Sequence, residues 1–132
     1  MDAASTFQPS QILCLEHQPG FLYAELIQAV VQRGAVWVRP LALKIPKSGA
    51  ATAASCLLGV DLETSDLYDL RRSSDLLWPS VLFREALDTE VIPLLAHLGN
   101  QKYNPQSDRQ AHEQLRRFIH QVWQDNAAVF HD

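Results

Sequence analysis

The stretch Phe21–Ile45, FLYAELIQAVVQRGAVWVRPLALKI, decides the fold. Two runs rich in aliphatic and aromatic residues flank Gln32–Gly34, and a three-residue hairpin loop often ends in a left-handed residue, which glycine adopts without steric cost. The stretch therefore predicts an antiparallel hairpin in which Val31 pairs with Ala35. A helix over Ala24–Gln32 is the rival interpretation, because alanine, glutamate, leucine and glutamine favour helices. The valine-rich return run favours the hairpin.

The hairpin places alternate side chains on opposite faces of the ribbon. One face, interpreted as core, holds Leu22, Ala24, Leu26, Val30, Val36 and Val38. The other face holds Tyr23, Glu25, Ile27, Trp37, Arg39 and Leu41. A shift of one residue in the pairing would exchange the two sets, so the faces depend on the register.

Shorter strands are predicted on both sides of the hairpin. Gln11–Glu16 is a short apolar run that ends before the Pro-Gly turn signal. After a small and polar loop over Pro46–Ser55, the runs Cys56–Leu62 and Leu67–Arg71 have strand character. Leu76–Pro79 closes the β-rich half, because a residue that precedes proline is disfavoured in a helix.

The remaining chain is predicted to be helical. Ser80 is a plausible N-cap for a helix over Val81–Leu87. Glu90–Leu98 forms a second helix with Pro93 in or just beyond its first turn, or one helix runs through and kinks at Pro93. Ser107 opens the last helix in a capping box with Gln110. The apolar stripe of that helix comprises Ala111, Leu115, Phe118, Ile119, Val122 and Trp123.

These elements predict one α+β domain, a small antiparallel SH3-like β-barrel or sheet followed by two or three C-terminal helices. Residues 1–10 form a flexible leader, residues 11–125 the domain, and residues 126–132 a tail. Within the domain, residues 11–79 are the β-rich half and residues 80–125 the helical half. A chain of 132 residues with 47% hydrophobic residues can bury a core without disulfides or metals.

Composition limits the classes of function. The net charge of −4 is shared evenly between the two halves of the chain, which disfavours a nucleic-acid partner held by charge. No run of residues is long and apolar enough for a membrane span, and the N-terminus lacks a signal pattern. With only two cysteines, the expected location is the cytoplasm.

No catalytic, cofactor or metal motif stands out. The glycines form no phosphate-binding or dinucleotide-binding loop, and there is no G-x-S-x-G nucleophile motif. Cys14 and His17 are residue types that bind metals, but residues three apart on a strand point to opposite faces. We therefore expect a buried thiol and a turn histidine there, and no cofactor.

Five residues are candidates for binding a partner. Trp37 and Arg39 alternate with the inward valines, and tryptophan and arginine are enriched where protein partners bind most tightly. Tyr23 is expected on the same face as Trp37 and Arg39. The alternative is that the C-terminal helix covers this face, with its apolar stripe over Trp37. Arg71 and Arg72 follow a strand and suit an anion or an acidic peptide, or simply form surface ion pairs with Asp69 or Asp75.

Two runs carry a family resemblance. They are LYAELIQAVVQRGAVWVRPLAL, Leu22–Leu43, and LYDLRRSSDLLWPSVLFREALDTEVIPLL, Leu67–Leu95, and together they resemble a small conserved cyanobacterial protein family of unassigned function. The resemblance covers about two fifths of the chain and brings no functional residues. It implies a bacterial cytosolic setting.

The sequence thus predicts a non-enzymatic protein-interaction module, such as an adaptor, assembly or regulatory factor, with a protein partner of unknown identity. The alternative is a small barrel that binds single-stranded RNA, with aromatic rings stacked on bases and arginines along the backbone. An enzyme is the third hypothesis, and it requires a pocket with a carboxylate or histidine of strongly shifted pKa.

Overall fold

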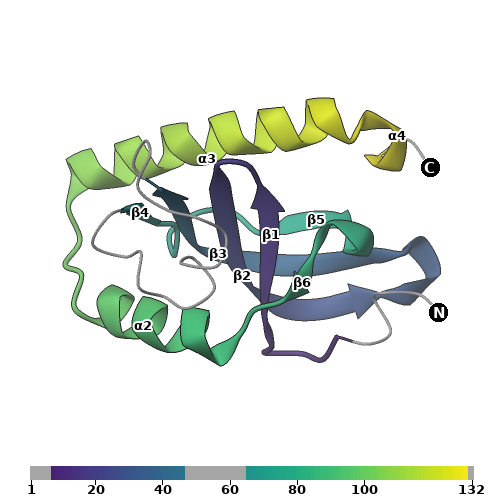
Figure 1. Ribbon diagram of the computed structural model, residues 1–132, viewed down its shortest axis with the longest axis horizontal. Coiled ribbons are helices and arrows are strands. Elements are labelled where there is room, and N and C mark those ends of the chain that lie inside the picture. The colour runs from purple at the N-terminus through teal and green to yellow at the C-terminus, as the bar shows by residue number, and fades with distance from the viewer. Residues whose placement is uncertain (1–6, 47–64, 131–132) are drawn as a thin grey trace.

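The computed structural model of the protein describes residues 7–46 and 65–130. In this part of the chain, six strands form one antiparallel sheet and the helices follow it, so the predicted α+β class is confirmed (Figure 1). Most of the predicted leader and loop, and the whole strand predicted over Cys56–Leu62, lie outside the described residues. The elements are β1 (Ile12–His17), β2 (Gly20–Val30), β3 (Ala35–Pro46), β4 (Ser65–Asp69), β5 (Leu76–Pro79), β6 (Arg84–Glu85), α2 (Asp88–Gly99), α3 (Pro105–Asp125) and α4 (Ala127–Phe130).

The hairpin of β2 and β3 is present, and the rival helix is not. Its pairing differs by one residue from the prediction, because Val30 and not Val31 is opposite Ala35. The connection is longer than three residues: Val31–Arg33 form a 3-10 turn, and Gly34 follows in the left-handed region at a φ of 60°. Ala29 and not Val30 is therefore opposite the buried Val36, so the prediction that Val30 lies on the core face is wrong. A bulge at Ile27 in β2 places Leu26 opposite Val38, and Val36 and Val38 are fully buried, as predicted.

The long strand β3 organises the sheet. The strand order is β4-β3-β2-β1-β6, and β5 pairs with the part of β3 nearest the hairpin turn. β4 pairs with the other end of the same strand, from Ala42 to Pro46. The segment between β4 and β5 therefore runs beside the middle of β3.

Helices cover the two faces of the sheet. On one face, α3 contributes Ala111, Leu115, Phe118 and Val122 to a core that includes Val36 and Val38. Against the other face, α2 packs Leu94 and Leu98 in a second cluster. Figure 1 shows these two helices on opposite sides of the strands. Part of the face opposite the main core is therefore covered by α2 and not by the last helix.

The helix predicted over Val81–Leu87 is wrong. Ser80–Leu82 form a single 3-10 turn, labelled η4, and Arg84–Glu85 extend as β6 beside β1. The Ser80 backbone N–H and its hydroxyl both donate to the Gly34 carbonyl oxygen, at 2.8 and 2.9 Å. The hydroxyl is therefore used to fasten η4 to the hairpin turn, and it does not cap a helix.

The later helices exist but begin earlier than predicted. α2 begins at Asp88 and contains Pro93 in its interior without a break in the helix. α3 begins at Pro105 and not at Ser107, because the Asn104 side chain accepts hydrogen bonds from the backbone N–H groups of Gln106 and Ser107. The expected tail includes α4, in which the Phe130 ring packs edge-on against Trp78 at 5.1 Å. Within the described residues, no helix combines the length and the apolarity needed to cross a membrane.

Candidate functional site

Trp37 and Arg39 lie at an exposed part of the sheet, beside β5. Trp37 is 40% exposed, and its cross-strand neighbour Leu77 on β5 is 52% exposed. Strand alternation explains this placement, because the neighbours of Trp37 on β3 are the buried Val36 and Val38. The alternative that the last helix covers Trp37 is wrong, since α3 packs on the valine face.

Asp75 joins the two predicted partner-binding residues. The indole N–H of Trp37 donates to Asp75 Oδ2 at 3.0 Å, and Arg39 Nε lies 3.4 Å from Asp75 Oδ1. The carboxylate thus holds both side chains in place, while the aromatic ring remains exposed and the Arg39 side chain is about half exposed. We call Trp37, Arg39, Asp75 and Leu77 the indole surface. It can offer a partner an apolar ring, an aliphatic side chain and the terminal nitrogens of an arginine.

Tyr23 does not belong to this surface, so the expectation that it shares an exposed face with Trp37 is wrong. Its side chain is 1% exposed and packs in the cluster beneath α2. Its hydroxyl donates to Glu90 Oε1 at 2.8 Å. Alternation places the ring on the expected side of the strand, but α2 covers that end of the sheet.

Arg71 and Arg72 lie in the segment after β4, apart from the indole surface. Arg71 binds Asp69 through two side-chain contacts of 3.0 and 2.7 Å, which is the local ion pair considered as an alternative. The Arg72 guanidinium stacks over the Tyr103 ring at 3.8 Å. Both arginines line a polar hollow of about 720 Å³ between β4 and the connection from α2 to α3.

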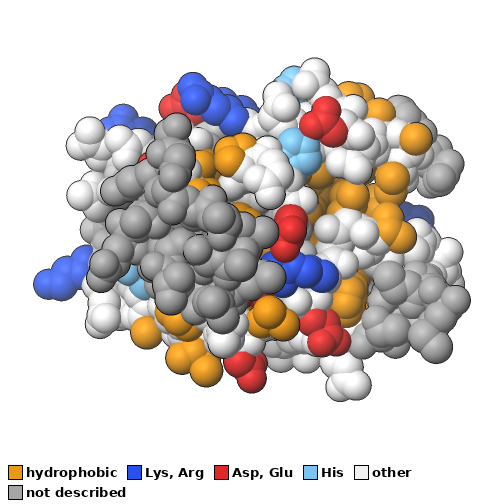
Figure 2. Space-filling model, in the orientation of Figure 1, with side chains coloured by type: hydrophobic (Ala, Val, Ile, Leu, Met, Phe, Trp, Pro, Cys, Tyr) orange, Lys and Arg blue, Asp and Glu red, His pale blue; other side chains and the backbone are white. Residues whose placement is uncertain are grey.

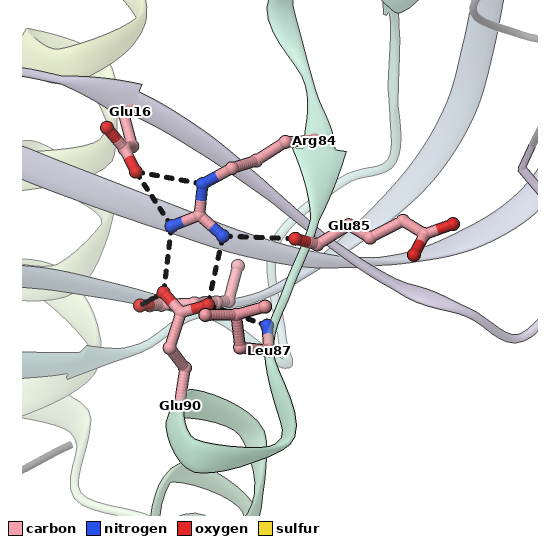
Figure 3. Close-up of polar contacts among 6 residues, drawn as sticks. Glu16, Arg84, Glu85, Leu87 and Glu90 are labelled. Atoms are coloured by element: carbon pink, nitrogen blue, oxygen red, sulfur yellow. Dashed lines mark hydrogen bonds and ion pairs between the residues drawn. The ribbon is translucent and has the colours of Figure 1, made fainter. Parts of the chain in front are cut away.

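A second polar cluster was not predicted from the sequence. Glu90, at the start of α2, has a fully buried side chain, and Arg84 of β6 donates to both of its carboxylate oxygens at 2.8 and 2.9 Å (Figure 3). Arg84 also pairs with Glu16 of β1 at 2.8 Å. The Leu87 backbone N–H donates to Glu90 Oε2 at 2.7 Å. With the Tyr23 hydroxyl, Glu90 therefore accepts four hydrogen bonds. We call Tyr23, Arg84 and Glu90, with Glu16, the buried carboxylate cluster.

Burial and hydrogen bonding act in opposite directions on Glu90. Burial raises the pKa of its carboxyl, but the hydrogen bonds from Arg84, Leu87 and Tyr23 outweigh that effect, so the pKa lies below its ordinary value of 4.5. Burial also raises the pKa of Tyr23, and the neighbouring Cys14 and Glu90 add to this increase. Glu90 is consequently ionised and Tyr23 protonated at neutral pH.

The buried carboxylate cluster has a structural role. Four donors occupy the acceptor positions of Glu90, which leaves none for a substrate. Burial raises the pKa of the neighbouring Cys14 thiol to about 12, so it is protonated and a poor nucleophile near neutral pH. The cluster instead connects β1, β2, β6 and the first turn of α2.

Cys14 and His17, the two residue types considered for metal binding, have separate surroundings. Cys14 lies in β1 and is buried in the cluster with α2, whereas His17 Nε2 lies 2.7 Å from Asp125 Oδ2 at the end of α3. Within residues 7–46 and 65–130, no group of three or more histidine, cysteine or acidic side chains is arranged to hold a metal ion.

Sequence reasoning found Trp37 and Arg39 but missed the residues that complete their surface. Asp75 and Leu77 are close to Trp37 only because β5 pairs with β3, across nearly forty positions in the chain. The alternation of Leu76-Leu77-Trp78 was the available signal, since Trp78 is buried and Leu77 is exposed. Glu90 gave no such signal, because acidic residues are common in the first turn of a helix.

No protein-family model matches the chain, and no curated protein or solved structure shows significant similarity to it.

Proposed function

We propose that the protein is a non-enzymatic interaction module that binds another protein through the indole surface. The observation that carries the proposal is the exposed pair of Trp37 and Leu77, which the ion pair between Asp75 and Arg39 borders. Because the indole N–H is already bonded to Asp75, a partner would contact the ring through its apolar face. Held side chains lose little conformational freedom on binding, which favours affinity.

The strand arrangement supports an SH3-like barrel as part of this proposal. Strands β6, β1, β2, β3 and β5 are neighbours in that order, and the 3-10 turn η4 connects β5 to β6. Small barrels of this kind commonly present recognition surfaces on a rigid sheet. A cytoplasmic setting also belongs to the proposal, and the low cysteine content supports it.

RNA binding is the weaker candidate. Its predicted contacts are divided by the fold, because Tyr23 is buried while Arg71 and Arg72 line a polar hollow that does not include Arg39. Carboxylates also pair with Arg39 and Arg71, and this reduces their attraction for phosphates. A fluorescence titration with mixed oligonucleotides at low salt tests this candidate, and saturable binding would favour it over the proposal.

Site-specific photo-crosslinking tests the interaction. A photoreactive amino acid replaces Leu77 in the tagged protein within its native cells, and the crosslinked partner is identified by mass spectrometry. We expect one dominant protein adduct, which disappears when Trp37→Ala and Arg39→Glu are added. An adduct that survives these changes, or no adduct at all, would contradict the proposal.

Tyr103→Ala with Arg72→Glu is the matched control. This variant also removes an exposed aromatic ring and reverses the charge of a neighbouring arginine, but it does so at the polar hollow beside β4. We expect this variant to retain the adduct. If it loses the adduct as the first variant does, the partner does not depend specifically on the indole surface.

A further inference from the structure

The indole surface extends toward the hairpin turn as an apolar area with two arginines. Leu77 also lines a hollow of about 510 Å³ together with Arg33, Val81 and Phe130. Val81 is 66% exposed, because the hydrogen bonds from Ser80 to Gly34 hold η4 against the turn. Among the described residues, none forms a hydrogen bond or an ion pair with the Arg33 side chain. The hairpin-end surface, as we call it, comprises Arg33, Trp37, Arg39, Leu77 and Val81.

A second apolar area has the opposite charge. On α2, Asp88, Ile92 and Leu95 follow helical spacing and share one exposed face. Ile92 is 68% exposed, and Leu87 and Leu95 are each about half exposed. Glu85 and Asp88 form no side-chain ion pair with any described residue, and Figure 3 shows the Glu85 carboxylate directed away from Arg84. We call Glu85, Leu87, Asp88, Ile92 and Leu95 the α2 surface.

The two surfaces are complementary and far apart. Each has three exposed aliphatic or aromatic side chains. The hairpin-end surface carries two arginines, one of which also contacts Asp75, and is still net positive, whereas the α2 surface carries two carboxylates. Figure 1 shows α2 and the turn between β2 and β3 at opposite ends of the molecule. In Figure 2, hydrophobic and acidic side chains lie side by side along the lower edge, where α2 is located. A single chain therefore cannot bring its own two surfaces together.

We propose that the partner at the hairpin-end surface is a second copy of this chain, which docks its α2 surface there in a head-to-tail contact. The inference rests on the proposed function, because it names the partner of the same surface. Burial of the apolar side chains supplies the affinity, and the arginine–carboxylate pairs set the orientation. Because the contact joins two different surfaces, each added copy leaves one of each surface free, and the assembly grows or closes into a ring.

Two variants that each block one surface test the contact. Trp37→Ala with Arg39→Glu blocks the hairpin end, and Asp88→Lys with Ile92→Lys blocks α2, all at side chains outside the cores. The mass in solution is followed by light scattering and sedimentation from low micromolar to near-millimolar concentration. We expect the unmodified protein to exceed the mass of a dimer as its concentration rises, and the association to weaken as salt screens the arginine–carboxylate pairs. Each variant alone should remain a monomer.

Mixing the two variants distinguishes the head-to-tail contact from other ways in which two copies of the chain could associate. Together they retain one intact hairpin end and one intact α2 surface, so an equimolar mixture should form a dimer and grow no further. Circular dichroism checks that both variants keep the fold. A monomeric unmodified protein would overturn the inference, and so would a mixture that stays monomeric or an assembly that only one of the variants disrupts.

The same measurements distinguish this inference from the proposed function. If the protein is monomeric but position 77 still crosslinks a different protein, then the second copy is the wrong partner and the interaction surface is right. If the protein is monomeric and no crosslink forms, both ideas fail.

Discussion

Two clusters in this protein contain the same kinds of chemical group, but one is buried and the other is exposed. In the buried carboxylate cluster, Glu90 accepts hydrogen bonds from Tyr23 and Arg84. At the indole surface, Asp75 accepts them from Trp37 and Arg39. Each is a carboxylate between an aromatic donor and an arginine. The first is covered by α2 and saturated with donors, whereas the second is exposed. Burial thus decides whether the arrangement connects elements of the fold or remains exposed at the surface.

The largest expected difference follows from breaking the ion pair in the buried carboxylate cluster. Glu90→Gln leaves the Arg84 guanidinium without its main counter-charge and places an amide donor against it. Removing one partner of a buried ion pair typically costs about 3–5 kcal/mol. Urea denaturation should show a loss of unfolding free energy in that range. If the unfolding free energy falls by no more than the removal of a surface ion pair would cause, the cluster does not have a structural role.

Tyr23→Phe removes one of the four donors to Glu90 and keeps the ring in its packing. Hydrogen bonds to charged groups contribute about 1.5–3 kcal/mol, and the remaining three donors still hold the carboxylate. The variant should unfold at lower urea concentration with an unchanged denaturant slope. Trp37→Phe, which removes the corresponding donor to Asp75, is the matched comparison and should have the smaller effect.

Mildly acidic pH should weaken the buried carboxylate cluster by less than Glu90→Gln does, because only part of its stabilisation is lost until the pH falls below the folded pKa of Glu90. The pKa of Glu90 is lower in the folded chain than its ordinary value of 4.5, so the unfolded chain takes up the proton first. The stabilisation is complete above that ordinary value and is lost as the pH falls through the lowered folded pKa. The unfolding free energies of the unmodified chain and of Glu90→Gln, measured by urea denaturation, should therefore become more nearly equal as the pH is lowered. A constant difference across this range would contradict the assigned pKa.

The smallest effect is expected at the exposed carboxylate. Asp75→Asn weakens the contact with Arg39, whose side chain is about half exposed. Surface ion pairs contribute at most about 1 kcal/mol, so the unfolding free energy should hardly change. The fluorescence of Trp37 should respond instead, because its indole N–H is bonded to Asp75. A stability loss as large as that of Glu90→Gln would remove the contrast between the two clusters.

The sequence by itself determined the hairpin and its inward valines. Alternation and β-propensity are local properties, so they identified Val36 and Val38 as core and left Trp37 and Arg39 on the other side. The apolar stripe of α3 was likewise readable, since Ala111, Leu115, Phe118 and Val122 are buried. Ile119, in the same predicted stripe, is only partly buried, and Trp123 is exposed, so the stripe is narrower than predicted. The order of strands followed by helices needed no long-range information.

Only the tertiary structure decided which outward side chains are covered. Tyr23 and Trp37 are both outward residues of the same hairpin, yet α2 covers one and leaves the other exposed. Ser80 has the local features of a helix cap, but its hydroxyl bonds to Gly34 across the fold. The pairing of β5 with β3 brings Asp75 to Trp37. Each of these outcomes depends on contacts between segments that are distant in the sequence. Local sequence patterns do not determine which of those segments come into contact.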